Sequence, residues 1–396
     1  MAKELLLKKG REKSSKRHHP WIFSGAVEKV TGDPGMGESL LVRDGDGQLV
    51  GWAAYSPASQ IRARFWNYDP TQSVQLDFFV GQLQKALARR QAIWPLGLPA
   101  AFRWVNGEND GLPGLVVDRY GDYLVCQFLS AGTETAKTMI LEALQNLWPA
   151  QGVVERSDVS VREKEGLAPV KGLLAGTLPS GPVPVEIGGI HFAVDLLEGH
   201  KTGHYLDQRE NWAVVRQLAQ GKEVLNCFGY TGGFSLAALQ GGATKVTQVE
   251  LSGPANRQFE ANLALNALGS EAVTVREEDV FKELRLMRDQ GKSFDLVILD
   301  PPKFAESQSQ LDKAARGYKD INLLAMKLIR PGGLLVSFSC SGAMEPKLFQ
   351  KILADAALDA HKEAHLLRRL GPGPDHGPNL NFPEGDYLKG LLVALD

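Results

Sequence analysis

The stretch EVLNCFGYTGGFSLAALQGG, residues 223–242, predicts a strand, a glycine-rich turn and a helix in immediate succession. The alternation continues toward the C-terminus. We expect strands at 245–251, 272–279, 294–300 and 334–341, helices at 255–268, 280–290 and 318–329, and a loop over 301–317. Alternating strands and helices are typical of a parallel sheet covered by helices on both faces. Residues 188–396 are therefore expected to form a Rossmann-like α/β domain.

The chain upstream of this domain is expected to contain two further parts. Residues 1–75 hold short β-rich segments separated by glycine turns, a pattern typical of a small β-barrel. Residues 76–187 begin with helical apolar spacing over 77–94, and after two strand-like runs an amphipathic helix is expected over 134–148, which together indicate a middle α/β domain. The Gly- and Pro-rich stretch over 164–189 is expected to be irregular and to contain the second domain boundary near its end.

The composition fits a soluble globular protein, with 43% hydrophobic and 23% charged residues in a chain of 396. The three-leucine run near the N-terminus is too short for a signal peptide or a membrane span. The three cysteines lie far apart and form no CxxC pair, which indicates a reducing compartment and no metal site. We therefore expect a cytoplasmic protein without a metal or membrane partner. The sequence leaves the oligomeric state open, with a homodimer among the assemblies considered.

Positive charge gathers at the N-terminus, although the net charge of the chain is only −2. A local cationic patch is what contact with a phosphate backbone requires. On charge alone, a solvated basic tail is an equally good interpretation. The candidate nucleic-acid contacts in this segment are Lys8, Lys9, Arg11, Lys13 and Arg17.

The glycine-rich turn is a candidate cofactor site. Glycines there let the backbone pass close to a ligand at the carboxyl end of the first strand. The turn lacks the G-x-G-x-x-G pattern of a pyrophosphate-binding loop. A ligand without phosphate, such as S-adenosylmethionine (SAM), is therefore favoured over NAD. The candidate contacts are Asn226, Phe228, Tyr230, Thr231, Gly232 and Gly233.

Acidic residues at the ends of the next two strands add to this interpretation. Glu250 is placed to accept hydrogen bonds from ribose hydroxyls, and Asp279 is placed to contact an adenine amino group. Each acid taken alone is equally suited to capping the helix that follows it. Together, behind a glycine-rich turn, they favour a nucleoside ligand.

The segment Asp300-Pro301-Pro302-Lys303-Phe304 follows the fourth strand and places a carboxylate and a rigid turn beside the same crevice. It resembles the Asp/Asn-Pro-Pro-aromatic loop of methyltransferases that act on planar nitrogen heterocycles. Such a loop suits a base flipped out of its stack, with Asp300 bonded to the base edge and Phe304 stacked on the ring. Asp300 is also a candidate for the cofactor pocket. The alternative is an ordinary loop start.

Cys340 ends a further strand in a turn-like Ser/Gly-rich context, SFSCSG over 337–342. Cytosine C5 is too weakly nucleophilic to take a methyl group directly, and thiolate addition at C6 makes it enamine-like. A free thiol has a pKa of about 8.5, so a site that lowers the pKa would help. The alternative role, a small buried hydrophobic residue, is the one we expect for Cys126 and Cys227.

Longer motifs extend across the whole chain. They are GREKS (10–14), HPWIFSGAV (19–27), YSPASQIRAR (55–64), GENDGLPG (107–114), GHKTGHYLDQR (199–209), YTGGF (230–234), DPPKF (300–304), FSCS (338–341) and FPEGDYLKG (382–390). With these motifs in this order, the chain resembles the bacterial 23S ribosomal RNA cytosine-C5 methyltransferases that carry an N-terminal PUA domain. The resemblance implies a PUA RNA-binding domain, a middle α/β domain, a SAM-binding domain, 23S ribosomal RNA as partner and Cys340 as nucleophile.

The resemblance also places part of the 199–209 motif against the SAM pocket, although its residues alone indicate only a polar loop. The positions concerned are Lys201, Thr202, Gly203, Tyr205, Asp207 and Arg209. Glu250 stands where relatives often have Asp, and either side chain binds ribose. Related enzymes with two site cysteines carry one in the Pro-Pro loop. This chain has none there, which leaves its product-release step open.

Two other functions fit parts of the pattern. An exocyclic-amino methyltransferase would work through Asp300 and the Pro-Pro loop, with Cys340 only structural. A non-catalytic RNA-binding assembly factor would keep the fold without binding SAM. The intact glycine turn and the two acids count against that second alternative.

Overall fold

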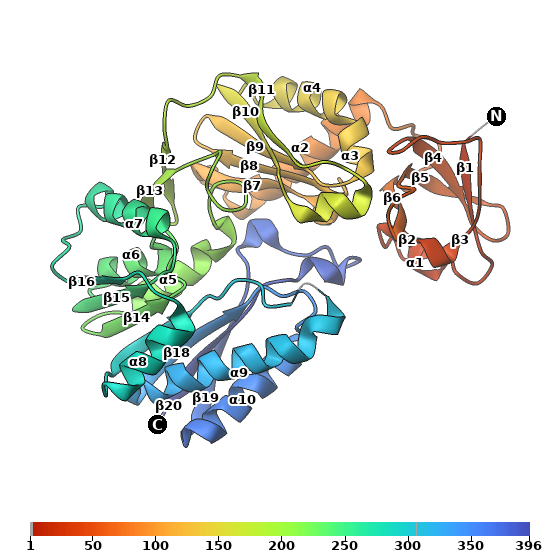
Figure 1. The fold of residues 1–396 in the computed structure, drawn as a ribbon. Coiled ribbons are helices and arrows are strands. Elements are labelled where there is room, and N and C mark those ends of the chain that lie inside the picture. Colours follow the sequence, from red (N-terminus) through yellow and green to blue (C-terminus); the bar gives the residue numbers. More distant parts are fainter. Residues whose placement is uncertain (1–2, 306) are drawn as a thin grey trace. The chain divides into compact units, whose positions relative to one another are not determined.

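The computed structural model describes residues 3–305 and 307–396 (Figure 1). Contacts divide the chain into two compact units. The first comprises Met1–Val185, Val194–Leu206 and Pro374–Gly385, and the second comprises Glu186–Ala193, Asp207–Gly373 and Asp386–Asp396. The first unit contains two separate sheets, and the predicted three-domain division at residues 75 and 187 stays a prediction.

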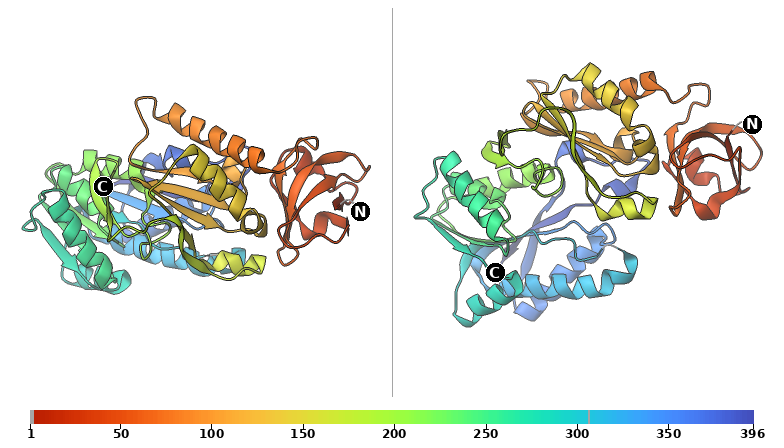
Figure 2. Two further views of the ribbon diagram at one scale, coloured as in Figure 1. Left: turned by 90° about the horizontal axis from the view of Figure 1, so that it is seen from above. Right: turned by 45° about the horizontal axis from the view of Figure 1, so that its top comes forward.

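The N-terminal sheet of the first unit has six strands in the order β2-β6-β5-β4-β1-β3. Alternating apolar residues such as Leu5, Leu7, Leu40 and Val42 point to one side and form its core. The six strands curl around this core, as Figure 2 shows, in agreement with the predicted small barrel. They are β1 (Glu4–Leu7), β2 (Trp21–Phe23), β3 (Val27–Thr31), β4 (Ser39–Arg43), β5 (Leu49–Tyr55) and β6 (Ile61–Asn67), with the short helix α1 (Lys13–Lys16) after β1.

The second sheet of the first unit has the order β11-β10-β9-β8-β7. Helices α2 and α4 pack on it through a shared apolar core. Although α2 has 18 residues, no helix in the described part of the chain combines the length and apolar character that a membrane span requires. The elements are α2 (Leu76–Ile93), β7 (Ala101–Asn106), β8 (Leu115–Tyr120), β9 (Tyr123–Phe128), α3 (Ala131–Thr135), α4 (Lys137–Leu147), β10 (Gly152–Ser157) and β11 (Val170–Gly176).

One local prediction for this part of the chain is confirmed in outline and another is wrong. The helix expected over 134–148 is present as α4, and the short helix α3, which Ser130 begins by capping the backbone N–H of Thr133, precedes it. The stretch 164–189, expected to be irregular, contains β11 and the strand β12 (Val183–Ile187), which pairs with β13 (Ile190–Val194). The register of the β10–β11 pairing shifts at Leu174, so β11 contains a bulge there, and the positive-φ residues Gly172 and Gly176 lie two positions to either side of it.

The second unit is built on a seven-stranded sheet in the order β16-β15-β14-β17-β18-β20-β19. Helices α8, α9 and α10 bury their apolar sides in one core, while α5, α6 and α7 belong to the opposite face (Figure 1). The strands are β14 (Glu223–Cys227), β15 (Lys245–Val249), β16 (Val273–Arg276), β17 (Phe294–Leu299), β18 (Ile329–Ser339), β19 (Ala364–Leu370) and β20 (Lys389–Leu395). The helices are α5 (Arg209–Leu218), α6 (Gly233–Gln240), α7 (Gly253–Leu265), α8 (Val280–Asp289), α9 (Leu311–Lys327) and α10 (Pro346–Ala360).

The predicted strand–helix alternation is confirmed, with two corrections. The sheet is parallel from β16 to β18, but β20 returns antiparallel beside β18, and β19 is antiparallel to β20, so the sheet is mixed. Helix α9 begins at Leu311, seven residues before the expected start at Tyr318. Residues of this added part, such as Leu311 and Ala314, belong to the apolar core of that face, which favours helix there.

Candidate active site

The loops that follow four parallel strands leave the sheet of the second unit at one edge. Cys227 of β14 is paired with Val249 of β15 and with Leu299 of β17, and Leu299 is paired with Ser337 of β18. Parallel strands in this register end together, and the crevice outside their carboxyl ends is where open α/β sheets bind ligands. Of the predicted site residues, those that directly follow these strands are Phe228, Glu250, Asp300 and Cys340.

The glycine-rich turn after β14 has a special backbone. Phe228 and Tyr230 adopt φ angles of +61° and +46°, a left-handed conformation that is unfavourable for non-glycine residues and typical of functional turns. Gly232 has a φ of +93°, and a Cβ atom there would lie 2.0 Å from Cδ2 of Phe259. At Gly233 a Cβ atom would lie 2.7 Å from the Trp212 ring. These two glycines are therefore required for packing of the turn against Phe259 and Trp212, a role that the sequence does not predict.

Glu250 is hydrogen-bonded to the glycine-rich turn. Its Oε2 accepts the backbone N–H of Tyr230 at 2.9 Å, and its Oε1 accepts that of Ser252 at 2.8 Å. The side chain is half-buried. Glu250 thus fixes the turn, and its contact with ribose hydroxyls stays a prediction.

Asn226 and Thr231 are more deeply buried than Glu250. Asn226 is buried in β14, and its Nδ2 donates to Ser235 Oγ at 2.9 Å, while its Oδ1 has no hydrogen-bond partner among the described residues. Thr231 is buried, and its carbonyl accepts a hydrogen bond from Asn262 Nδ2 at 3.0 Å. A buried acceptor without a partner is costly unless a ligand or water donates to it, so Asn226 fits a donor-bearing ligand at this turn.

Asp279 has the capping role that we considered as its alternative. It is exposed, and its Oδ1 accepts the backbone N–H of Lys282 at 3.0 Å at the start of α8. A contact from Asp279 to an adenine amino group stays a prediction.

The residues predicted from the 199–209 motif are shared between the two units. In the first unit, the Lys201 ammonium lies 4.4 Å from the centre of the Tyr205 ring. Thr202 is fully buried and donates to Asp118 Oδ2 at 2.6 Å, and Gly203 adopts a φ of +139°. Thr202 is therefore anchored in the second sheet of that unit, and a role for these four residues at the cofactor stays a prediction.

Asp207 and Arg209 belong to the second unit, and both are buried. The hydroxyl of Tyr387 donates to Asp207 Oδ2 at 2.5 Å. Between them in sequence, Gln208 Nε2 donates to Asp300 Oδ2 at 3.0 Å and so orients the carboxylate of the Pro-Pro loop. Gln208 and Tyr387 both lie in the long motifs, but the sequence does not predict their roles. Their contacts with Asp300 and Asp207 depend on the tertiary fold.

The Pro-Pro loop has a buried and an exposed side. Pro301 is buried, whereas Pro302 and Lys303 are exposed. The Phe304 ring packs against Tyr318 at 4.7 Å and Phe281 at 6.0 Å between ring centres. The ring of Phe304 is thus engaged in the protein core in this conformation, and its predicted stacking on a base stays a prediction.

Cys340 is the partly exposed cysteine of the three, and its Sγ lies 4.0 Å from the carbonyl oxygen of Pro301. The thiol therefore lies beside the Pro-Pro loop. Cys126 and Cys227 are completely buried, and burial raises the pKa of both thiols, which keeps them protonated and inert. Their expected structural role agrees with this burial.

One tyrosine joins the Cys340 turn to the Pro-Pro loop. The Tyr318 hydroxyl accepts from Ser339 Oγ at 2.9 Å and lies 3.3 Å from Ser341 Oγ. Ser341 Oγ in turn accepts the backbone N–H of Ala305 at 3.3 Å. Burial raises the pKa of Tyr318, so its hydroxyl stays neutral and able to bridge the two serines. Nothing in the local sequence around Tyr318 indicates this role.

The predicted nucleic-acid contacts of the N-terminal segment lie on the surface of the first unit. Lys9 pairs with Asp46 at 2.8 Å, and the Lys8 ammonium donates to the Gly25 carbonyl at 3.2 Å. No ion pair involves the other three within the described residues. All five are exposed: Lys8, Lys9, Arg11, Lys13 and Arg17.

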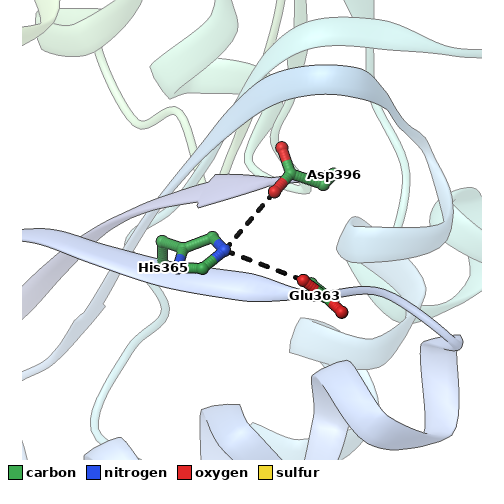
Figure 3. A group of neighbouring side chains, drawn as sticks. All are labelled: Glu363, His365 and Asp396. Atoms are coloured by element: carbon green, nitrogen blue, oxygen red, sulfur yellow. Dashed lines mark ion pairs between the residues drawn. The ribbon is translucent and has the colours of Figure 1, made fainter.

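One group of three side chains in the described part of the chain has ligand atoms close enough for a metal ion. His365 Nε2 lies 3.4 Å from Asp396 Oδ2 and 4.0 Å from Glu363 Oε2 (Figure 3). All three residues are exposed, and such groups are common as surface ion pairs of small energetic value. We assign no metal function to them.

Comparison with family models gives two matches. Residues 178–394 match the S-adenosylmethionine-dependent methyltransferase model, and residues 5–68 match a PUA-like domain model. The first match covers the whole crevice edge described above, and the second covers the N-terminal sheet.

Curated proteins and solved structures give matches over the full length. The chain is 49% identical to "Ribosomal RNA large subunit methyltransferase I" of Shewanella denitrificans, with 100% of both chains covered. It is also 49% identical to the protein of that name from Aeromonas hydrophila, with 99% of both covered. A putative SAM-dependent methyltransferase from Streptococcus mutans has the same fold, with a TM-score of 0.86, 22% identity and 100% of both chains covered. The chain therefore belongs to the S-adenosylmethionine-dependent methyltransferases, in the family of the proteins named Ribosomal RNA large subunit methyltransferase I.

Proposed function

We propose that this methyltransferase places the methyl group on C5 of a cytosine in 23S ribosomal RNA, with Cys340 as nucleophile. The observation that carries the proposal is the position of the partly exposed Cys340 thiol, 4.0 Å from the Pro301 carbonyl at the ligand edge of the sheet. The substrate class follows the name of relatives that are 49% identical over their whole length. The cytoplasmic location and a homodimer stay predictions.

The residues at the glycine-rich turn fit the cofactor of this family. Glu250 offers a carboxylate for ribose hydroxyls, and the buried Asn226 Oδ1 offers an acceptor that has no partner among the described residues. In the turn that follows β14, Phe228, Tyr230 and Gly232 adopt left-handed φ angles. When bound, S-adenosylmethionine supplies an electrophilic methyl group.

The chemistry of the protein itself centres on one thiolate. The Cys340 sulfur adds to C6 of the cytosine, forming an S–C bond and moving the C5–C6 electron pair onto C5. C5 then takes up the methyl group. Removal of the C5 proton re-forms the C5–C6 double bond and expels the thiolate, so Cys340 is regenerated.

Asp300 and the Cys340 turn are held by neighbouring side chains. Gln208 donates to one oxygen of Asp300 and so orients the carboxylate that we propose binds the amino edge of a flipped base. Tyr318 fixes the serines on both sides of Cys340. Holding reactive groups in a productive geometry lowers the entropic part of the barrier.

The basic segment of the N-terminal sheet is the proposed contact with the RNA backbone. Arg11, Lys13 and Arg17 are exposed, and no ion pair involves them within the described residues, so their charges are available to phosphates. Lys9 is partly neutralised by Asp46. Phosphate contacts of this kind add affinity without sequence preference.

Replacing the proposed nucleophile should separate chemistry from cofactor binding. We expect Cys340→Ala to lower methyl transfer to 23S RNA by at least roughly a thousandfold, because the covalent step is lost, while calorimetry shows unchanged SAM affinity. Cys126→Ala, at a buried cysteine of the first unit, is the matched control and should keep its activity. Methyl transfer by Cys340→Ala at the wild-type rate would rule out the covalent mechanism.

A mechanism-based substrate distinguishes C5 methylation from exocyclic-amino methylation. RNA containing 5-fluorocytosine cannot lose a proton from C5, so the covalent intermediate should accumulate as a denaturant-stable adduct in the presence of SAM. The adduct should be absent from Cys340→Ala, as electrophoresis of labelled RNA will show. An amino methyltransferase acting through Asp300 would methylate this RNA without forming an adduct, and that result would refute our proposal.

The close packing of Gly232 predicts that its replacement lowers the affinity for SAM. Gly232→Ala forces both an unfavourable φ, costing roughly 1–2 kcal/mol, and a clash with Phe259. We expect SAM affinity measured by calorimetry to fall about tenfold or more. Gly291→Ala is the control, because Gly291 has a φ of +66° with no atom near its added Cβ, and it should leave SAM affinity unchanged. Equal affinities in the two variants would show that the turn does not form the cofactor site.

Salt dependence tests the RNA contact. In the triple variant Arg11→Gln, Lys13→Gln, Arg17→Gln, we expect the slope of log affinity for RNA against log salt concentration to become shallower by about 2, since each phosphate contact contributes about 0.7–0.9. Fluorescence anisotropy with labelled 23S RNA fragments measures the slope.

A matched triple variant controls for net charge. Lys282, Arg288 and Lys319 lie on α8 and α9 and are each paired with a carboxylate, so their replacement by Gln should leave the slope nearly unchanged. The same slope in both triple variants would contradict a specific RNA contact by the N-terminal segment.

A further inference from the structure

Lys389 is the only lysine that is buried among the described residues, with 6% of its surface exposed. It is the first residue of β20, and its ammonium donates to the carbonyl oxygen of Ser341 at 2.7 Å. No carboxylate in the described part of the chain lies within ion-pair distance of it. A buried ammonium that is hydrogen-bonded only to a carbonyl oxygen destabilises the fold. We therefore expect a negatively charged group near Lys389.

The register of the sheet places this lysine at the Cys340 turn. Lys389 is paired with Ser339 across the antiparallel β18–β20 ladder. Directly opposed residues in such a ladder project to the same face, where Ser339 reaches Tyr318. From there the Lys389 side chain extends to the carbonyl of Ser341. Its contacts therefore flank Cys340, with Ser339 before the cysteine and Ser341 after it.

The charges that act on Lys389 come from three other residues. Asp386 and Cys340 favour the charged ammonium, whereas Lys303 of the Pro-Pro loop opposes it. Burial opposes it most strongly, and the net effect lowers the pKa of Lys389. Tyr318, the other titratable group packed on the turn, stays neutral because burial raises its pKa. Asp386 and, when it is ionised, Cys340 are thus the groups that favour the charged form of this lysine.

Building on the proposed nucleophilic role of Cys340, we propose that Lys389 is a positioning residue that supplies the counter-charge for the Cys340 thiolate and anchors the turn that carries it. A thiolate at Cys340 offsets the cost of the buried ammonium, and the ammonium in turn favours the ionised thiol. The two groups therefore titrate as a coupled pair. Loss of the proton from Cys340 should occur at lower pH with Lys389 present than without it.

The pH dependence of Cys340 alkylation tests this proposal without RNA or methyl transfer. The full-length protein is treated with iodoacetamide over a pH series, and peptide mass spectrometry follows the Cys340 adduct alone. In Lys389→Met we expect the midpoint of the rate profile to rise by about one pH unit or more, because an opposite charge close to a thiol lowers its pKa by about that amount. At pH 7 alkylation should slow by about threefold, since the more basic thiolate is also more nucleophilic.

Two further measurements keep the test decisive. Lys303→Gln removes the other nearby cation, an exposed one, and should move the midpoint less than Lys389→Met does. In the wild-type protein the midpoint should lie below the value of about 8.5 for a free thiol, which can be measured even if Lys389→Met does not fold. An unshifted midpoint in folded Lys389→Met, a shift produced by Lys303→Gln alone, or a wild-type midpoint at or above the free-thiol value would each overturn the proposal.

The alkylation experiment and the 5-fluorocytosine experiment test the role of Lys389 and the cytosine chemistry separately. A shifted midpoint without a 5-fluorocytosine adduct supports the pairing of Lys389 with the Cys340 thiolate and refutes only the cytosine chemistry. An adduct with an unshifted midpoint overturns the role of Lys389 and leaves Cys340 as nucleophile.

Discussion

The parallel register of β14, β17 and β18 is the constraint on which the candidate site depends. Because Cys227 is aligned with Leu299, and Leu299 with Ser337, the loops that follow these strands emerge at one edge of the sheet although they are far apart in sequence. The antiparallel β20 then begins at that same edge, which brings Lys389 opposite Ser339. A purely parallel sheet would end β20 there instead of starting it, and the site would lose its buried cation.

Side-chain hydrogen bonds fix the positions of the candidate site residues at this edge of the sheet. Gln208 orients Asp300, Glu250 holds the glycine-rich turn, and Tyr318 bridges the two serines around the cysteine. Each proposed functional group is thus supported by a neighbour from another element, as preorganised sites require. The Cys340 residue is partly exposed, whereas Cys126 and Cys227 are buried in the cores of their sheets. The proposed reactivity of Cys340 therefore rests on its partial exposure and on the hydrogen bonds that hold its turn, and not on the presence of a cysteine as such.

The sequence predicts the strand–turn–helix core and the strand-end position of Asp300 and Cys340, because apolar periodicity and glycine turns are local signals. It does not predict the antiparallel return of β20 or the strand β11 within a glycine-rich stretch, since strand pairing depends on distant partners. The same limit applies to single residues. Gln208, Tyr318 and Lys389 gain their roles only from tertiary contacts, and Asp279, chosen for its strand-end position, caps a helix in the folded chain.

The central claim is that this chain methylates cytosine C5 through Cys340, and bisulfite sequencing of large-subunit ribosomal RNA tests it most directly. Cytosines methylated at C5 resist conversion by bisulfite. In cells lacking the gene, we expect one cytosine of 23S RNA to become convertible, and its protection to return with the wild-type chain but not with Cys340→Ala. Unchanged protection of every cytosine in the deletion strain, or restored protection by Cys340→Ala, would contradict the account.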